Sequence, residues 1–175
     1  MRKVAMTSNL FGEHTGAIFS PCRRYRYRLW REWDSAKPKV CFVMMNPSTA
    51  DEVNDDPTVA GCQIRIALWP GKYGGVIVVN VFAWRETDSK LLPRLIAAGE
   101  DIVGPENDQA ILTAATDAGL VVCAWGVPGE LGGRGRHVLK MLRDNGIVPH
   151  AFQLNQDGSP RHPLYIGHDV VPSPF

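Results

Sequence analysis

Two asparagines stand directly after apolar segments, where their side chains could serve recognition chemistry. Asn46 follows the apolar residues 40–45 and precedes Pro47, whose ring restricts the turn, with Ser48 next. Asn80 ends a second apolar segment in the same way. A primary amide carries two N–H donors and one acceptor oxygen, so either side chain can orient a water or read a ligand's polar edge. The alternative is an asparagine that only caps its loop.

A histidine late in the chain adds a second kind of chemistry. His162 follows Arg161 within the proline-containing segment 159–165. An imidazole at the end of a strand can donate a hydrogen bond to an anion that develops during a reaction. The alternative is a loop histidine with no chemical role.

Acidic residues gather between the first asparagine and the next expected helix. They are Asp51, Glu52, Asp55 and Asp56. Oxygen ligands of this type suit a hard cation such as Mg²⁺. We favour a solvated cluster that caps the helix, because two of the four stand where that helix begins. The glycine-rich residues 129–135 lack the Gly-Lys-Ser/Thr ending of a phosphate-binding loop.

Residues 22–31 hold five arginines and three aromatic residues. Arginine next to aromatic rings suits phosphate contact and base stacking, which predicts a nucleic-acid surface. The period of two also predicts an ordinary amphipathic strand, with tyrosines inward and Arg24, Arg26 and Arg28 facing water. We favour the amphipathic strand, whose basic face would remain free to contact nucleic acid.

The elements that must position these residues follow from apolar periodicity. Continuous apolar runs predict strands, buried on both faces, at residues 40–45, 75–82 and 120–125. A last strand is expected at residues 147–154, at a sheet edge because it contains Pro149. Helices are expected at residues 57–68, 89–98, 105–118 and 135–145, the first with Pro57 in its first turn and Asp55 or Asp56 as its cap.

This alternation predicts an α/β fold: a three-layer α/β/α sandwich with a central, mostly parallel four-stranded sheet. Residues 1–36 are expected to form an N-terminal antiparallel arm, and residues 37–175 the core of one domain spanning 1–175. In such sheets, ligands bind at the carboxyl ends of the strands. Asn46, Asn80 and His162 follow these ends, as do Phe82 and Trp84.

Composition limits the classes of protein to which the chain can belong. The chain has 175 residues, of which 45% are hydrophobic and 21% charged, as in an ordinary folded domain. Its net charge of +1 gives no overall attraction to nucleic acid. No apolar run approaches the roughly 20 residues that span a bilayer, and the N-terminus lacks a secretory signal. We expect a cytoplasmic protein with no membrane partner, no cofactor and four free core cysteines.

At the four expected strand ends, the sequence resembles the uracil-DNA glycosylase superfamily. Val-Met-Met-Asn-Pro at residues 43–47 is similar to the first motif, whose residue before proline positions the hydrolytic water. Residues 75–80 look like the strand whose terminal asparagine reads the base edge, and residues 121–126 are similar to the next core strand, which ends in Trp-Gly. Arg-His-Pro-Leu at residues 161–164 looks like the late loop whose histidine stabilises the departing uracil anion.

The run Met-Asn-Pro-Ser-Thr-Ala-Asp at residues 45–51 resembles, more closely, an uncharacterised bacterial and phage family, a domain of unknown function. That second resemblance covers nearly the whole chain and implies no activity. The superfamily resemblance implies hydrolysis of an N-glycosidic bond in DNA or in a nucleotide. The residues expected to form the site are Asn46 and His162 as catalytic residues, and Pro47, Ser48, Asn80, Phe82, Trp84 and Arg161 as substrate-binding residues.

In this hypothesis Asn46 orients a water toward the sugar C1′. An amide cannot accept a proton at neutral pH, so Asn46 would act by positioning, which predicts a slower enzyme than one with aspartate there. Asn80 would bind the base edge, His162 would stabilise its anion, and Phe82 or Trp84 would stack on it.

Two other functions remain open. The first is a non-catalytic module that binds a nucleotide or nucleic acid through the same pocket, aided by the arginine strand. The second is metal-dependent phosphate chemistry at Asp51, Asp55 and Asp56.

Overall fold

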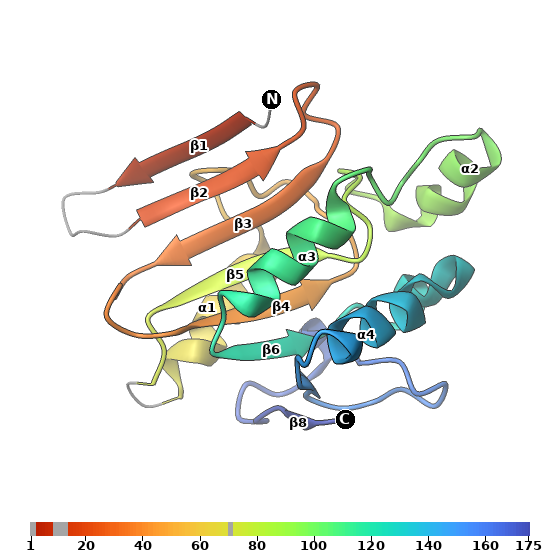
Figure 1. Ribbon diagram of the computed structural model, residues 1–175. Helices are drawn as coiled ribbons and strands as arrows, with labels where there is room; N and C mark the ends of the chain where they lie inside the picture. Colours follow the sequence, from red (N-terminus) through yellow and green to blue (C-terminus); the bar gives the residue numbers. More distant parts are fainter. Residues whose placement is uncertain (1–2, 9–13, 70–71) are drawn as a thin grey trace.

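The computed structural model describes residues 3–8, 14–69 and 72–175. Its strands form one sheet in the order β1-β2-β3-β5-β4-β6-β7-β8 (Figure 1). The strands are β1 (Lys3–Ser8), β2 (His14–Phe19), β3 (Arg26–Glu32), β4 (Lys39–Met44), β5 (Gly75–Asn80), β6 (Leu120–Cys123), β7 (Pro149–Ala151) and β8 (Ser173–Pro174).

The strands β5, β4, β6 and β7 run parallel to one another. All of β5 and all of β4 after Lys39 are buried, as the continuous apolar runs predict. The chain passes from β4 to β5 on one side and then returns to β6 on the other. The segments that leave β4 and β6 therefore diverge, and such a point in a parallel sheet is where a ligand crevice forms.

The N-terminal strands extend this sheet. β3 pairs antiparallel with β5, with Leu29 opposite Val78, and β2 pairs antiparallel with β3. The sheet is therefore larger than the four strands expected, because β3 occupies the edge of β5. The apolar side of this extension, including Phe19 and Leu29, packs into the same core cluster as β4 and β5.

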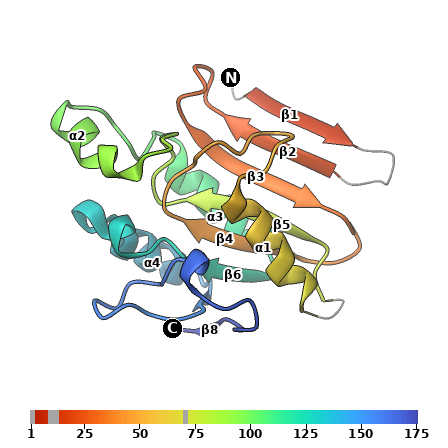
Figure 2. The same ribbon diagram turned by 180° about the vertical axis from the view of Figure 1, so that it is seen from behind.

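Helices cover both faces of the sheet. They are α1 (Pro57–Ala67), α2 (Leu92–Ala97), α3 (Asn107–Thr116) and α4 (Arg134–Asp144), with short 3₁₀ helices η1 (Ser89–Leu91), η2 (Val127–Gly133) and η3 (Pro163–Tyr165). α3 and α4 lie on the face seen in Figure 1, and α1 lies on the opposite face, seen in Figure 2. The α/β class predicted from the sequence is confirmed.

The helix ends follow the predicted chemistry closely. Asp56 caps α1 by accepting a hydrogen bond from the backbone N–H of Val59 at 2.9 Å, and Pro57 is the first helical residue. The expected helix at 89–98 is instead split into η1 and α2, and the next begins at Asn107, two residues after the expected start.

Two predictions are wrong: the edge position of the last parallel strand and the burial of all four cysteines. β7 is not an edge strand, because β8 pairs antiparallel with it and places Pro174 opposite His150. All four cysteines are free, but Cys22 is exposed instead of lying in the core.

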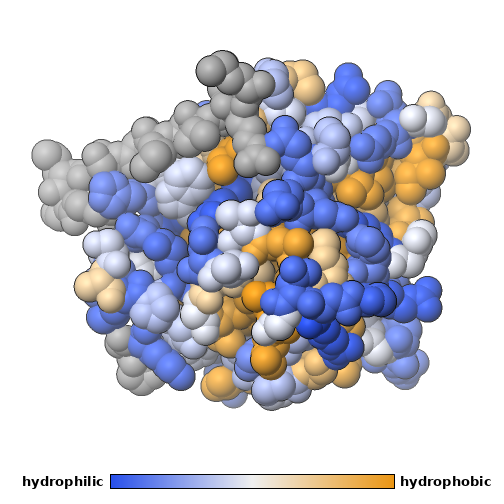
Figure 3. All heavy atoms as spheres, viewed as in Figure 1, coloured by the Kyte–Doolittle hydropathy of each residue, from blue (hydrophilic) through white to orange (hydrophobic). Residues whose placement is uncertain are grey.

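None of the helices in the described part of the chain has both the length and the apolar character to cross a bilayer. Figure 3 shows the face covered by α3 and α4, where hydrophilic side chains are spread over much of the surface. Hydrophobic side chains gather on this face near α2, whose Ile96 is 44% exposed.

Candidate functional site

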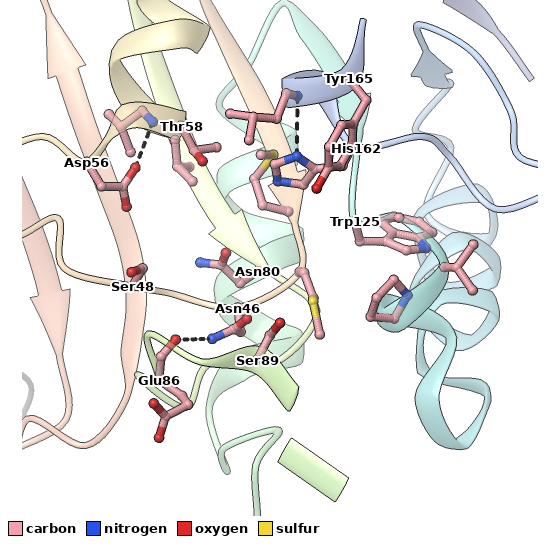
Figure 4. A pocket seen from close by; sticks show the side chains of 18 of the residues that line it. Asn46, Ser48, Asp56, Thr58, Asn80, Glu86, Ser89, Trp125, His162 and Tyr165 are labelled. Atoms are coloured by element: carbon pink, nitrogen blue, oxygen red, sulfur yellow. Dashed lines mark hydrogen bonds between the residues drawn. The ribbon is translucent and has the colours of Figure 1, made fainter. Parts of the chain in front are cut away.

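A cavity of about 630 Å³ lies at the carboxyl ends of the parallel strands. Its lining comes from the segments after β4, β5 and β6, from the first turn of α1, and from the segment that enters η3 (Figure 4). It therefore occupies the crevice that the strand order creates. Of the residues predicted from the sequence, Asn46, Ser48, Asn80, Arg161 and His162 line it.

Asn46 has an orientation fixed by the backbone. Its Nδ2 donates to the carbonyl oxygens of Pro47, at 3.1 Å, and of Glu86, at 2.7 Å (Figure 4). These bonds use both N–H donors of the amide. Its Oδ1 has no partner among the residues that the structure describes, so an acceptor oxygen remains available at the cavity. Pro47 is buried behind it and contributes the carbonyl that helps to hold Asn46.

Asn80 ends β5 with only 2% of its surface exposed. The Nδ2 of Asn107, in the first turn of α3, donates to the carbonyl oxygens of Asn80 and Val81 and so holds this strand end. The Asn80 side chain lines the cavity, and its own Nδ2 has no partner in the described part of the chain. A buried donor without an acceptor costs about 1–3 kcal/mol, which an acceptor atom of a ligand would recover.

His162 presents a neutral imidazole to the cavity. Its Nδ1 accepts a hydrogen bond from the backbone N–H of Leu164 at 3.3 Å, so the neutral ring carries its proton on Nε2. Burial lowers the pKa of His162 below its ordinary value of 6.5, and the carboxylate of Asp56 opposes that shift. At pH 7 the ring is therefore uncharged, with Nε2–H as a donor.

Contacts with β6 and α1 place the His162 segment. Gly126, directly after β6, donates its backbone N–H to the carbonyl oxygen of Pro160 at 2.8 Å. Its φ of +69° is in the left-handed region, which favours glycine. On the other side, the buried guanidinium of Arg65 in α1 donates to the carbonyl oxygens of Pro163 and Gly167.

Phe82 and Trp84 lie outside the cavity lining. Beyond Asn80 the chain turns against the core, and Phe82 is 2% exposed within the cluster that packs under α3 and α4. Trp84 contacts Tyr25 edge to face, with ring centroids 5.8 Å apart. The aromatic residues Trp125 and Tyr165 do line the cavity, and neither was among the residues expected to stack on the base.

The alternation predicted for the arginine strand is wrong at Arg26. Instead of facing water, Arg26 is 2% exposed, lines the cavity and donates from Nη1 to the carbonyl oxygen of Ala50 at 2.7 Å. The reason is that the β2–β3 register shifts between Ile18 and Phe19, so Arg26 lies opposite the buried Phe19, and the segment after β4 covers it. Arg24 and Arg28 form ion pairs with Glu100, at 3.4 Å, and with Asp117, at 2.7 Å.

The acidic residues expected to cap a helix or to hold a cation each bond to different partners. Asp51 accepts hydrogen bonds from backbone N–H groups of its own turn, and Asp55 forms an ion pair with Arg31 at 2.8 Å. Asp56 caps α1 and lines the cavity. Within the described residues, no group of three or more His, Cys, Asp or Glu side chains is placed to hold a metal ion.

Arg26, Asp56 and Glu86 are thus the charged cavity residues whose place the sequence reasoning missed. Asp56 beside Pro57 did signal a helix cap, but nothing in the sequence showed that the α1 start opens into the cavity. For Arg26 the only signal was a basic residue in a strand, and whether such a strand lies at an edge or inside depends on its pairing.

The comparison with protein families gives one match. Residues 26–164 match the DUF1643 family, which is described as a protein of unknown function. No curated protein and no solved structure matches the chain. The matched range begins at the first residue of β3 and ends within η3, so it contains every segment that lines the cavity except Tyr165. The chain belongs to the DUF1643 family.

Proposed function

We propose that this protein hydrolyses the N-glycosidic bond of a base in DNA or in a nucleotide, with a site like that of the uracil-DNA glycosylase superfamily. The observation that carries the proposal is the convergence of three side chains. Asn46, Asn80 and His162 are the residues that the resemblance selects, they come from distant parts of the chain, and they line one cavity.

Each side chain has a state that suits the proposed step. The free Oδ1 of Asn46 can accept a hydrogen bond from a water and aim it at C1′, while the two bonds from Nδ2 keep the amide from rotating. The unpaired Nδ2 of Asn80 can donate to an acceptor on the base. The neutral Nε2–H of His162 can donate to the anion that the departing base becomes.

The cavity and its rim also suit this substrate class. A volume of about 630 Å³ is in the range of small-ligand sites and can hold a nucleoside. Next to His162, Leu164 is 60% exposed and Tyr165 is 70% exposed, and Arg161 is exposed as well. Exposed apolar, aromatic and basic side chains beside a cavity that contains amide and imidazole groups suit contact with bases and phosphates.

The test is a base-release assay over a panel of normal, deaminated and modified bases, in free nucleotides and in DNA. We expect release of at least one base by the wild type and loss of release in Asn46→Ala and His162→Gln. Asn145→Ala, at an exposed asparagine after α4, is the matched control and should keep full activity. Full release by Asn46→Ala would overturn the water-positioning role.

The second candidate is a non-catalytic module that binds a nucleotide or nucleic acid in the same cavity. The observation that favours it is the amide at position 46, because an amide offers no general base for water. Tight binding of a nucleotide with no release of any base would select this candidate. Loss of DNA affinity in Arg161→Glu and Arg24→Glu would extend the binding surface to the rim and to the segment just before β3.

A further inference from the structure

The cavity lining includes two buried residues of opposite charge, Arg26 and Asp56, which interact electrostatically without being bonded to each other and are called a wall below. Arg26 is 2% exposed and Asp56 is 7% exposed, and both line the cavity. In the described part of the chain, neither a hydrogen bond nor an ion pair joins them. Buried charges are costly unless they are paired and hydrogen-bonded, so the space beside these two groups favours a ligand that bonds to both.

Arg26 supplies donors to this wall. Its Nη1 donates to the carbonyl oxygen of Ala50, but its buried Nε has no partner among the described residues. Burial lowers the pKa of Arg26 to about 10, and the nearby carboxylate of Asp56 opposes that shift. The guanidinium therefore stays charged at neutral pH. The unpaired Nδ2 of Asn80 adds a second buried donor to the same cavity.

Asp56 supplies the acceptor. One of its oxygens, Oδ1, accepts the α1 capping bond from Val59. Figure 4 shows its other oxygen pointing away from that turn, toward Ser48. This second oxygen has no partner among the residues that the structure describes. A carboxylate has about four lone-pair sites, so Asp56 can take two further N–H donors.

We infer that this wall binds the edge of a 2-amino-6-oxopurine, the guanine-type base. The carbonyl oxygen of the base faces Arg26 and Asn80, and its ring N–H and 2-amino group donate to Asp56. The inference rests on the proposed base-binding site and names the base that the site takes.

Other bases, and phosphate, form fewer favourable contacts with Arg26 and Asp56. In uracil the single ring N–H lies between two carbonyl oxygens, so an oxygen would lie near the Asp56 carboxylate. Adenine and cytosine carry one donor group on this edge where guanine carries two adjacent ones. A phosphate would bond to Arg26 but would be repelled by Asp56, which the cap of α1 holds in place.

Equilibrium binding to the intact protein tests the inference. The ligands are guanosine, inosine, adenosine, cytidine and uridine, and, in parallel, single-stranded oligonucleotides that differ in one base. Calorimetry reports binding, as does the tryptophan fluorescence of the protein, to which the cavity-lining Trp125 contributes. We expect guanosine to bind at least tenfold more tightly than inosine, which lacks the 2-amino group, and than the other three nucleosides.

Asp56→Asn is the decisive variant. To keep the α1 cap, the amide must turn its oxygen toward Val59, and it then presents N–H donors to the cavity. We expect guanosine affinity to fall at least tenfold and the difference between guanosine and inosine to disappear. Asp88→Asn makes the same change at the cap of η1, outside the cavity, where Asp88 accepts from the N–H of Lys90, and should leave both affinities unchanged.

The inference is overturned if any of the other nucleosides binds as tightly as guanosine, or if the guanosine preference survives in Asp56→Asn. It is also overturned if inorganic phosphate displaces the bound nucleoside, or if neither the nucleosides nor the oligonucleotides bind. The binding signal does not depend on base release, so a guanine preference without base release would contradict the proposed hydrolase alone. Release of bases without tighter binding of guanosine would contradict the guanine inference alone.

Discussion

The guanidinium of Arg65 donates a 2.6 Å hydrogen bond to the carbonyl oxygen of Pro163, the residue directly after His162. The same side chain donates to the carbonyl oxygens of Ile166 and Gly167, and it is 1% exposed. Helix α1 therefore holds both ends of η3. Because Asp56 caps this helix at its other end, one helix places the acidic group and the imidazole on the same cavity.

Arg65→Lys should lower the free energy of unfolding by about 2–4 kcal/mol, because buried carbonyls lose charged donors. Arg143→Lys is the control, since Arg143 also donates to a backbone carbonyl, that of Phe175, but is exposed. The Arg143→Lys variant should lose less than about 1 kcal/mol in the free energy of unfolding. Urea unfolding measures both variants. Equal losses would show that the contacts of Arg65 do not hold η3.

The stability of the protein should fall on the acid side of the His162 pKa. The folded-state pKa lies below the ordinary value of 6.5, so the unfolded chain binds the proton first. The contribution of His162 is therefore full above about pH 6.5 and is lost as the pH falls through the folded-state pKa. Relative to His162→Gln, the wild type should lose stability as the pH falls through about 6.5 toward the folded-state pKa.

Urea unfolding at a series of pH values follows this loss, and an NMR titration of the imidazole measures the pKa directly. The NMR spectrum should also show the proton on Nε2 in the neutral form, because Nδ1 accepts from Leu164. A titration midpoint at or above 6.5 would contradict the prediction.

Asn46→Asp should destabilise the protein instead of producing a more active site. The new carboxylate oxygen would replace Nδ2 and face the carbonyl oxygens of Pro47 and Glu86. We expect a loss of about 1–3 kcal/mol at pH 8, and a smaller loss at pH 4, where the protonated carboxyl can donate one bond.

Asn145→Asp serves as its control, because Asn145 also donates from Nδ2 to a backbone carbonyl, that of Met141, but at an exposed site. The control should lose less than about 1 kcal/mol. Urea unfolding at the two pH values measures both variants. Stability of Asn46→Asp that is unchanged at pH 8 would show that the two bonds of Asn46 do not fix the loop.

Charge reversal should distinguish the exposed Arg24, which lies just before β3, from the buried Arg26 in β3. Arg24→Glu breaks an exposed ion pair with Glu100 and should cost less than about 1 kcal/mol. Arg26→Glu buries a carboxylate in place of a guanidinium and should cost about 3–5 kcal/mol or prevent folding. Thermal melts compare the two variants, and similar melting temperatures would contradict the buried position of Arg26.

Much of the local structure could be predicted, because it depends on local physics. The buried strands β4 and β5 follow from continuous apolar runs, and the start of α1 follows from a capping aspartate before proline. The position of Asn46 and Asn80 at strand ends follows in turn, since a polar residue after such a run marks its end. The carboxyl-end rule then directs attention to the correct edge of the sheet.

Pairing between distant segments could not be predicted in the same way. The period of two in residues 22–31 places alternate side chains on opposite faces, but it does not say what covers each face. Arg26 is buried because a shift in the β2–β3 register places it opposite Phe19 and because the segment ending at Ala50 covers it. β7 is covered for a similar reason, as only two residues near the C-terminus pair with it.

The sequence by itself determined which side chains end the buried strands and what each can donate or accept. The tertiary structure decided which of them meet, and in what state. It fixed Asn46 through a carbonyl 40 residues away, left the Nδ2 of Asn80 without a partner among the described residues, and placed Arg26 and Asp56 in the same cavity. The reason is that strand order and loop packing are long-range properties, so burial and pairing of a polar group arise only when distant segments close around it.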